Sequence, residues 1–217
     1  MNHPSATMLY VVRHGETEYN RLGRVQGRGI DSPLNATGRH QAEALAQRLA
    51  DVPFQAIYTS TLRRTHQTAA PLQAQQPSVP TYPDPDLDEM NWGHFEGQAR
   101  SPEIEAAYRR IRAQWAEGIY DQPIPGGESV LEVQARGLRA LARITKAHAG
   151  GTVLLVSHGR FLKILLASIL SDGSLATMDE LLYPNTALTL LRYEADTYTA
   201  PLLVDRAHLD PTPYSLS

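Results

Sequence analysis

The sequence predicts an α/β fold with a largely parallel central sheet. Strand-like apolar runs at residues 9–12, 56–58 and 152–156 alternate with amphipathic, helix-like segments. Such alternation is typical of βα units, in which helices connect parallel strands. A chain of 217 residues with 42% hydrophobic residues can bury one large core, and nothing in its composition requires a second domain.

The first strand run, residues 9–12, leads directly into Arg13, His14 and Gly15. Two cationic side chains after an apolar strand cannot both be buried without partners, and ligands of open α/β sheets bind at the carboxyl ends of strands. We therefore expect Arg13 and His14 to point into a cleft. An isolated Arg-His-Gly sequence would also suit an ordinary, solvated surface loop.

The same construction occurs a second time near the carboxyl terminus. The run at 152–156 leads into Ser157, His158, Gly159 and Arg160, and a helix-like segment follows at 161–170. If the two strands are neighbours, both histidines lie at one edge of the sheet.

The run at 56–58 precedes a helix that carries Arg63 and Arg64 and that Ser60 is expected to cap. If all three strands are neighbours, their cations converge on one pocket. Such a pocket suits a dianion with the size and fork geometry of phosphate.

Local patterns predict the remaining elements. They are amphipathic helices at 37–50 and 129–148, a helix that starts at Ser101-Pro102, strands at 186–193 and 198–204, and a long Pro-rich connection at 71–85 that contains one short strand.

Composition excludes several classes of protein. A net charge of −3 without a long basic run argues against a nucleic-acid binder, and the lack of cysteine excludes thiolate metal sites and thiol nucleophiles. No apolar run is long enough for a membrane span. Residues 1–7 lack the features of a signal peptide, so we expect a loose tail and a cytoplasmic protein.

An ordered series of motifs resembles the histidine phosphatase superfamily, also called phosphoglycerate mutase-like. The series runs from Leu9 to about Leu191 and comprises RHGETEYN, QGRGIDSPLNATGRHQAEALAQRL, STLRRTHQTA, LDEMNWGHFEG, PGGESVLEVQAR, VLLVSHGRFLKILL and PNTALTLL. The resemblance implies a three-layer α/β/α sandwich formed by one domain, residues 8–217, in which residues 90–128 form a cap over the site.

The residue types suggest the chemistry, because a neutral imidazole is a competent nucleophile towards phosphorus. His14 is the candidate nucleophile, and Arg13, Arg64 and His158 are expected to stabilise the transferring phosphoryl group. The resemblance favours Arg64 over Arg63, which reads as a solvated helix charge.

The resemblance also implies an acid that protonates the leaving group. Glu89 matches the family's acid, although Asp88 next to it is an alternative; in an extended segment only one of the two can face the pocket. The residues expected to bind substrate are Arg13, Asn20, Gln26, Gly27, Arg64, Glu89, His158, Gly159 and Arg160. No metal or cofactor is expected.

The resemblance favours a phosphatase that acts on a small phosphorylated metabolite, because the segment between Glu89 and the Gly-Glu-Ser motif has the compact form common among the family's phosphatases. A phosphoglycerate mutase, which would need 2,3-bisphosphoglycerate as primer, is the alternative, since four arginines of the cap region could face the cleft: Arg100, Arg109, Arg110 and Arg112. A phosphate-binding protein without catalysis is a third possibility. The apolar segment 186–204 would suit a homodimer.

Overall fold

The computed structural model describes residues 6–99, 101–170 and 173–209. Its centre is a six-stranded sheet in the order β3-β2-β4-β1-β5-β6. Strands β1, β2, β3 and β4 pair in parallel, and β5 and β6 add an antiparallel edge. The predicted, mostly parallel α/β sheet is therefore confirmed. The strands are β1 (Thr7–Arg13), β2 (Ala56–Thr59), β3 (Thr81–Pro83), β4 (Thr152–Ser157), β5 (Leu188–Glu194) and β6 (Thr197–Asp205).

Alternation along the central strands builds a core on each face of the sheet. In β1, Leu9 and Val11 join a hydrophobic cluster on one face, whereas Val12 joins a separate cluster on the other. In β4, Leu155 and Val156 divide in the same way. Since side chains of a strand alternate between faces, a strand buried on both sides must be apolar along its middle, as Leu9–Val12 of β1 and Val153–Val156 of β4 are.

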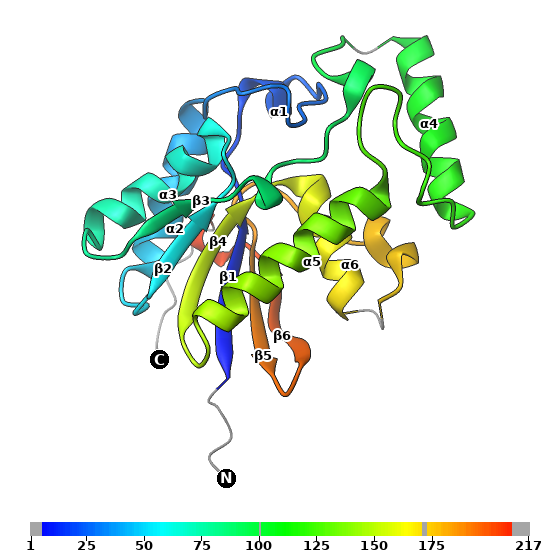
Figure 1. Ribbon diagram of the computed structural model, residues 1–217. Coiled ribbons are helices and arrows are strands. Elements are labelled where there is room, and N and C mark those ends of the chain that lie inside the picture. Colours follow the sequence, from blue (N-terminus) through cyan, green and yellow to red (C-terminus); the bar gives the residue numbers. More distant parts are fainter. Residues whose placement is uncertain (1–5, 100, 171–172, 210–217) are drawn as a thin grey trace, which may run out of the picture.

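Helices cover both faces and complete the three layers (Figure 1). On one side lie α2 (Ala36–Leu49) and α3 (Arg63–Gln75), and on the other lie α5 (Val130–Ala147) and α6 (Gly159–Leu170). Asn35 caps α2 and Ser129 caps α5, and in each case the side-chain oxygen accepts a hydrogen bond from a main-chain N–H.

Three sequence expectations are corrected by the structure. Ser60 does not cap α3, whose N-cap is Leu62; the Ser60 hydroxyl meets His158 instead. Helix α3 runs through Pro71 to Gln75, so the connection before β3 is shorter than predicted. Thr7, expected in the loose tail, begins β1 and is buried, while residues 1–5 of that tail lie outside the described residues.

Two helices lie at the end of the sheet where β1, β2 and β4 finish (Figure 1). These are α1 (Glu18–Arg21) and α4 (Pro102–Ala116). The helix predicted to start at Ser101-Pro102 is α4, and its apolar residues pack on the larger core cluster, with Trp115 buried inside it. Within the described residues, no helix is long and apolar enough to cross a membrane.

Candidate active site

The sheet topology brings together His14 and His158, the two histidines predicted for the site. Strands β1 and β4 are parallel neighbours, with Arg13 opposite Ser157 in the register. The main-chain N–H of His14 donates to the Ser157 carbonyl at 2.9 Å, which ties the two strand ends together. The imidazole rings of His14 and His158 consequently lie with their centroids 5.2 Å apart.

His14 is buried and has one ring nitrogen fixed by the main chain. Its Nδ1 lies 2.7 Å from the Gly15 carbonyl oxygen, and because a carbonyl only accepts, Nδ1 must carry the proton. Burial, with the charges of Arg64 and Arg13 adding to it, holds the pKa of His14 well below its usual range. The ring is therefore neutral near pH 7, and Nε2 keeps its lone pair.

Arg64 is the arginine of α3 that reaches this site, whereas Arg63 is exposed on the helix surface. The buried Arg64 donates from Nε to Nδ1 of His158 at 3.1 Å and from Nη1 to the Ile30 carbonyl at 2.7 Å. Burial lowers the pKa of Arg64 to about 10, so it stays a cation at neutral pH.

His158 uses both ring nitrogens within the protein. Since Arg64 donates to its Nδ1, the proton must lie on Nε2, which donates to the Ser60 hydroxyl at 2.7 Å. Burial, followed by the charge of Arg64, holds the pKa of His158 well below its usual range. The structure thus assigns the imidazole a position beside Arg64, and a direct bond to phosphate remains a prediction.

Arg13 presents a buried donor without a partner. Its Nη1 donates to the Tyr183 carbonyl at 2.7 Å, but its buried Nε has no hydrogen-bond partner. Leaving such a donor unpaired costs about 1–3 kcal/mol, which an anion oxygen would recover. Gly159 makes room for this group, because a Cβ there would lie 3.1 Å from the Arg13 Nε.

Glu89 and Asp88 point in different directions, as an extended segment requires. The Glu89 carboxylate faces the cavity and accepts the N–H groups of Phe161 at 2.9 Å and Arg160 at 3.2 Å, in the first turn of α6. Asp88 instead binds the main-chain N–H of Thr61 at 2.8 Å and forms a salt bridge with Arg28. Of the two carboxylates, only Glu89 lines the cavity.

The cavity in front of His14 has a volume of about 590 Å³. Its lining includes His14 and six of the nine residues predicted to bind substrate, namely Arg13, Asn20, Gln26, Glu89, Gly159 and Arg160. The other three, Gly27, Arg64 and His158, do not line it. A further cavity of about 490 Å³ adjoins it and shares Asn20, Arg24, Val25 and Tyr108 with it.

Gln26, Gly27 and Asn20 are held by their neighbours. Gln26 donates from Nε2 to the Thr17 hydroxyl at 2.7 Å, so its amide braces the turn after β1. Gly27 packs so closely that a Cβ would lie 2.0 Å from a Glu96 carboxylate oxygen. Asn20 accepts at Oδ1 from the Thr17 N–H, and its amide NH₂ is the end suited to an anion.

Arg160 lines the cavity but is already paired. Its Nη1 lies 2.7 Å from a carboxylate oxygen of Asp179, and its guanidinium carbon lies 5.0 Å from the centre of the Trp115 ring. Its side chain is 9% exposed, so it is neither a solvated charge nor a free cation. Arg160 of α6 thus contacts Trp115 of α4 and forms a salt bridge with Asp179.

Sequence reasoning missed Arg136, which supports the main chain around Glu89. The buried Arg136 donates to the carbonyls of Asp88 at 2.6 Å and Glu89 at 3.1 Å. It forms a two-pronged pair with Glu128, at 2.9 and 3.1 Å. Its place at the end of the PGGESVLEVQAR motif was the available signal, but spacing along α5 does not reveal which carbonyls it meets.

The three described arginines of the segment 90–128 do not line the cavity in front of His14. Arg109 lines the adjoining cavity, Arg112 pairs with Asp179 at 3.1 Å, and Arg110 is exposed. Arg100 lies outside the described residues. Across the described ranges there is no group of three or more His, Asp or Glu side chains that could hold a metal ion.

The fold and the site together define an α/β protein with two buried histidines, the buried Arg64 and the partly buried Arg13 at the carboxyl ends of parallel strands. The family model of the histidine phosphatase superfamily (branch 1) matches residues 9–206. The chain belongs to this superfamily, whose members are enzymes.

Relatives of known name are similar to it over most of its length. A protein from Yersinia enterocolitica named "Probable phosphoglycerate mutase GpmB" is 36% identical over 93% of this chain and 94% of its own. The solved structure of Bacillus stearothermophilus YhfR superposes with a TM-score of 0.84, at 34% identity, covering 94% of this chain and 100% of that one. An alpha-ribazole phosphatase from Shigella flexneri follows with a TM-score of 0.78, at 26% identity, covering 91% and 96%.

Proposed function

We propose that this protein is a phosphomonoester hydrolase that works through a phosphohistidine on His14. The observation that carries the proposal is the orphaned Nε of Arg13 beside a neutral, oriented His14, in a cavity lined by Glu89. These groups provide an anion site, a nucleophile and an acid within one pocket. The small phosphorylated metabolite that binds there is the substrate.

The first step is attack on phosphorus by Nε2 of His14. The bond to the Gly15 carbonyl fixes the proton on Nδ1, so that the lone pair of Nε2 is available without prior deprotonation. The P–O bond to the leaving group breaks as the N–P bond forms. Burial and the neighbouring arginines keep the ring unprotonated for this step.

Arg13 and Arg64 balance the charge on the transferring group. Phosphoryl transfer depends mainly on positioning and on stabilising the charge of the equatorial oxygens. Arg13 offers its unpaired Nε, and Arg64 adds a buried positive charge behind His14. This arrangement supports catalysis without a metal ion, because two guanidinium groups supply the positive charge that a metal supplies elsewhere.

Glu89 donates a proton to the leaving oxygen in the first step. In the second step it accepts a proton from the water that attacks the phosphohistidine, which releases inorganic phosphate and restores His14. Exposed side chains such as Arg24 and Arg206 line the same cavity, so water has access to it. That access favours transfer to water.

The alternative is a phosphoglycerate mutase, which passes the phosphoryl group back to a second oxygen of the bound sugar acid. The name of the 36% identical Yersinia relative favours it. The alpha-ribazole phosphatase and the positions of Arg109, Arg110 and Arg112 away from His14 favour the hydrolase.

The test measures inorganic phosphate from para-nitrophenyl phosphate and glycerol 3-phosphate, alongside interconversion of 2- and 3-phosphoglycerate primed with bisphosphoglycerate. We expect phosphate release without isomerisation, no release by His14→Asn, and an acid-labile phosphate on His14 by rapid-quench mass spectrometry. Isomerisation with little phosphate release would make the protein a mutase, and no turnover in either assay would leave a binding protein.

A variant of the acid separates its role from general damage. Glu89→Gln should lower kcat/KM for glycerol 3-phosphate about 100-fold or more, because the leaving alkoxide needs a proton. The loss in kcat/KM should be far smaller for para-nitrophenyl phosphate. Asp88→Asn is the matched control, because Asp88 binds Thr61 and Arg28 outside the cavity. Equal losses on both substrates by Glu89→Gln would contradict the assignment.

A further inference from the structure

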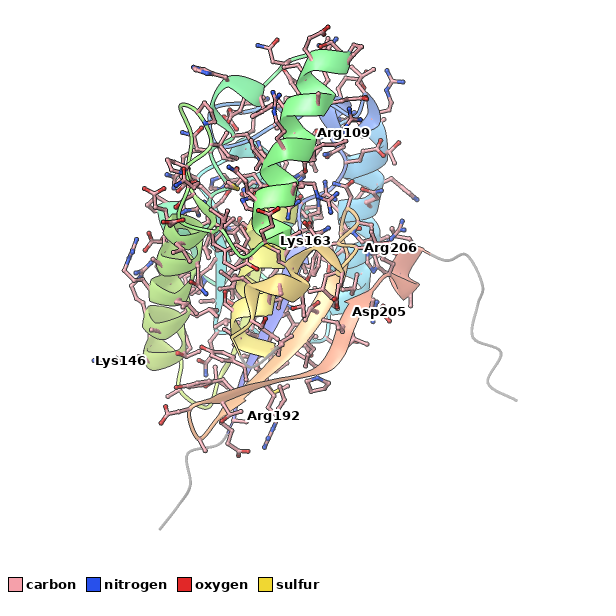
Figure 2. All side chains as sticks on the ribbon, turned by 90° about the vertical axis from the view of Figure 1, so that its right-hand side faces the viewer. Arg109, Lys146, Lys163, Arg192, Asp205 and Arg206 are labelled. Carbon is pink, nitrogen blue, oxygen red and sulfur yellow. The ribbon has the colours of Figure 1, made fainter. Side chains whose placement is uncertain are left out.

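Three cations of the cavity wall, Arg24, Lys163 and Arg206, bind no group in the steps above, and Arg24 also lines the adjoining cavity. Lys163 of α6 and Arg206, which follows β6, both line the cavity in front of His14. Figure 2 shows them on the same face of the molecule, reached from two different elements. Neither forms a salt bridge with any of the described residues.

Lys163 lies one helical turn beyond the groups that surround the transferred phosphate. It follows Gly159 by four residues in α6, which places both on one face of the helix, about 6 Å apart along its axis. Both residues line the cavity. The ammonium group of Lys163 is therefore positioned to meet a substrate group a few bonds away from the phosphate.

The nearby carboxylate does not neutralise Lys163. Asp179 is held by Arg160 at 2.7 Å and by Arg112 at 3.1 Å. Burial, with the charge of Arg160 next in size, lowers the pKa of Lys163, so this lysine is a cation in unfavourable surroundings. An anion bound beside Lys163 would stabilise its charged form.

Among the described residues, Arg206 likewise has no acidic side chain paired with it. Its neighbour Asp205 forms a salt bridge with Arg48 and accepts a hydrogen bond from the Ala207 N–H at 2.9 Å. Arg206 is exposed, yet its side chain forms part of the cavity wall. Its guanidinium is therefore available to a ligand at the mouth of the cavity.

The charge of the cavity lining exceeds what one phosphate requires. Among the described residues, Glu89 is the one carboxylate in that lining, and it faces Arg13, Arg24, Arg160, Lys163 and Arg206. A phosphate dianion at His14 is matched by Arg13 and Arg64, and Arg160 is paired with Asp179. Lys163 and Arg206 remain as positive charge that the phosphate does not use, together with Arg24, which also lines the adjoining cavity.

We propose that Lys163 and Arg206 form a second anion subsite, so that the preferred substrate carries a carboxylate or a second phosphate on its leaving group. The inference rests on the proposed phosphatase reaction at His14 and adds a substrate class to it. Both anions share one chemistry at this subsite, a small oxyanion bound by an ammonium and a guanidinium.

The experiment compares two substrates that share a primary phosphate ester and differ in one group. 3-Phosphoglycerate carries a carboxylate where glycerol 3-phosphate carries a hydroxymethyl group. We expect the wild type to favour 3-phosphoglycerate in kcat/KM by about tenfold or more, and Lys163→Gln and Arg206→Gln each to remove most of that preference. A parallel pair with a second phosphate, glycerol 1,3-bisphosphate against glycerol 3-phosphate, distinguishes the two anions.

Lys146→Gln is the matched control, because it removes the same charge from the exposed end of α5 (Figure 2). It should leave the preference unchanged. The subsite is overturned if Lys163→Gln and Arg206→Gln lower kcat/KM equally for both substrates, or for neither. Turnover of para-nitrophenyl phosphate would in that case still support the hydrolase proposal.

Absence of all turnover in the wild type would reject the hydrolase proposal instead. The subsite is then measured by calorimetric titration of wild type, Lys163→Gln and Arg206→Gln with the same ligands. A preference of wild type for 3-phosphoglycerate that both variants lose supports the subsite, and equal affinities for 3-phosphoglycerate and glycerol 3-phosphate overturn it.

Discussion

Arg64 holds His158 in a single orientation, donating from its Nε to the imidazole Nδ1 at 3.1 Å. The same guanidinium donates to the carbonyls of Ile30 at 2.7 Å and Gly27 at 3.3 Å. Three of its donors are thus fixed by the protein, and the group cannot rotate. A planar fork held in this way is a geometric element of the site as well as a charge.

Arg64→Lys should therefore be a severe change although it keeps the charge. A lysine ammonium cannot reach His158, Ile30 and Gly27 together, so both the ring and the charge move. We expect kcat/KM for para-nitrophenyl phosphate to fall about 100-fold. Arg63→Lys, one residue earlier on the exposed face of α3, should have no measurable effect; comparable losses in both variants would refute this account.

The buried histidines predict how stability depends on pH. Burial, followed by nearby positive charge, holds the pKa values of both His14 and His158 well below their usual range. In the unfolded chain each ring takes up a proton near pH 6.5, whereas in the folded protein it stays neutral to much lower pH. The unfolding free energy should thus be constant near pH 8 and fall as the pH drops below about 6.5.

Each of these histidines contributes a slope of up to about 1.4 kcal/mol per pH unit in that acidic range. Urea unfolding at pH steps from 8 to 5 measures this slope. In His14→Asn the unfolding free energy should fall less steeply with decreasing pH, by the contribution of one proton. His40→Asn, on the exposed face of α2, serves as the comparison and should leave the curve as in the wild type. An unchanged slope in His14→Asn would show that its proton uptake does not differ between the two states.

The fold and the central residues of the site could be predicted from the sequence because they follow local patterns. Apolar runs ending in Arg13, His14 and His158 identify strand ends, and parallel strands place such ends at one edge of a sheet. The position of Ser60 was not readable in this way. Its hydroxyl could cap a helix or meet a residue 98 positions away, and only the packing of β2 beside β4 selects His158.

Contacts that bridge distant segments were likewise beyond local pattern. The sequence places Arg160 among the predicted substrate-binding residues. It does not show the partner Asp179, which lies 19 residues away at the end of a short 3-10 helix. Arg136 ends the PGGESVLEVQAR motif on an amphipathic helix, but that place does not reveal its partners. Its role depends on the approach of the Glu89 loop, which no spacing within α5 encodes.

The Arg136–Glu128 pair predicts a stability effect centred on that loop. Glu128 accepts both prongs of the buried Arg136 and the main-chain N–H of Asn91 at 2.8 Å. Glu128→Gln would leave a buried guanidinium without its counter-charge, which costs about 3 kcal/mol. Chemical unfolding should reveal that loss. Glu18→Gln, which breaks an exposed pair with Arg21, should change stability little, and equal effects would count against a special role of the buried pair.

Gly159 offers a way to move Arg13 without touching its charge. A Cβ at this position would lie 3.1 Å from the Arg13 Nε and 3.2 Å from its Cζ, so the guanidinium must shift. We expect Gly159→Ala to lower kcat/KM about tenfold on every phosphomonoester. The melting temperature should not fall, because alanine suits the first turn of α6 better than glycine does.

The matched variant is Gly137→Ala in α5, where a Cβ would lie 3.0 Å from a Leu165 methyl group and 3.3 Å from the Phe161 ring. That change strains the packing between α5 and α6, so it should lower the melting temperature and leave kcat/KM in the folded protein close to wild type. Opposite responses of stability and activity in the two variants are the expected result. If Gly159→Ala kept full activity, the unpaired Nε of Arg13 would not be the donor that positions the phosphate.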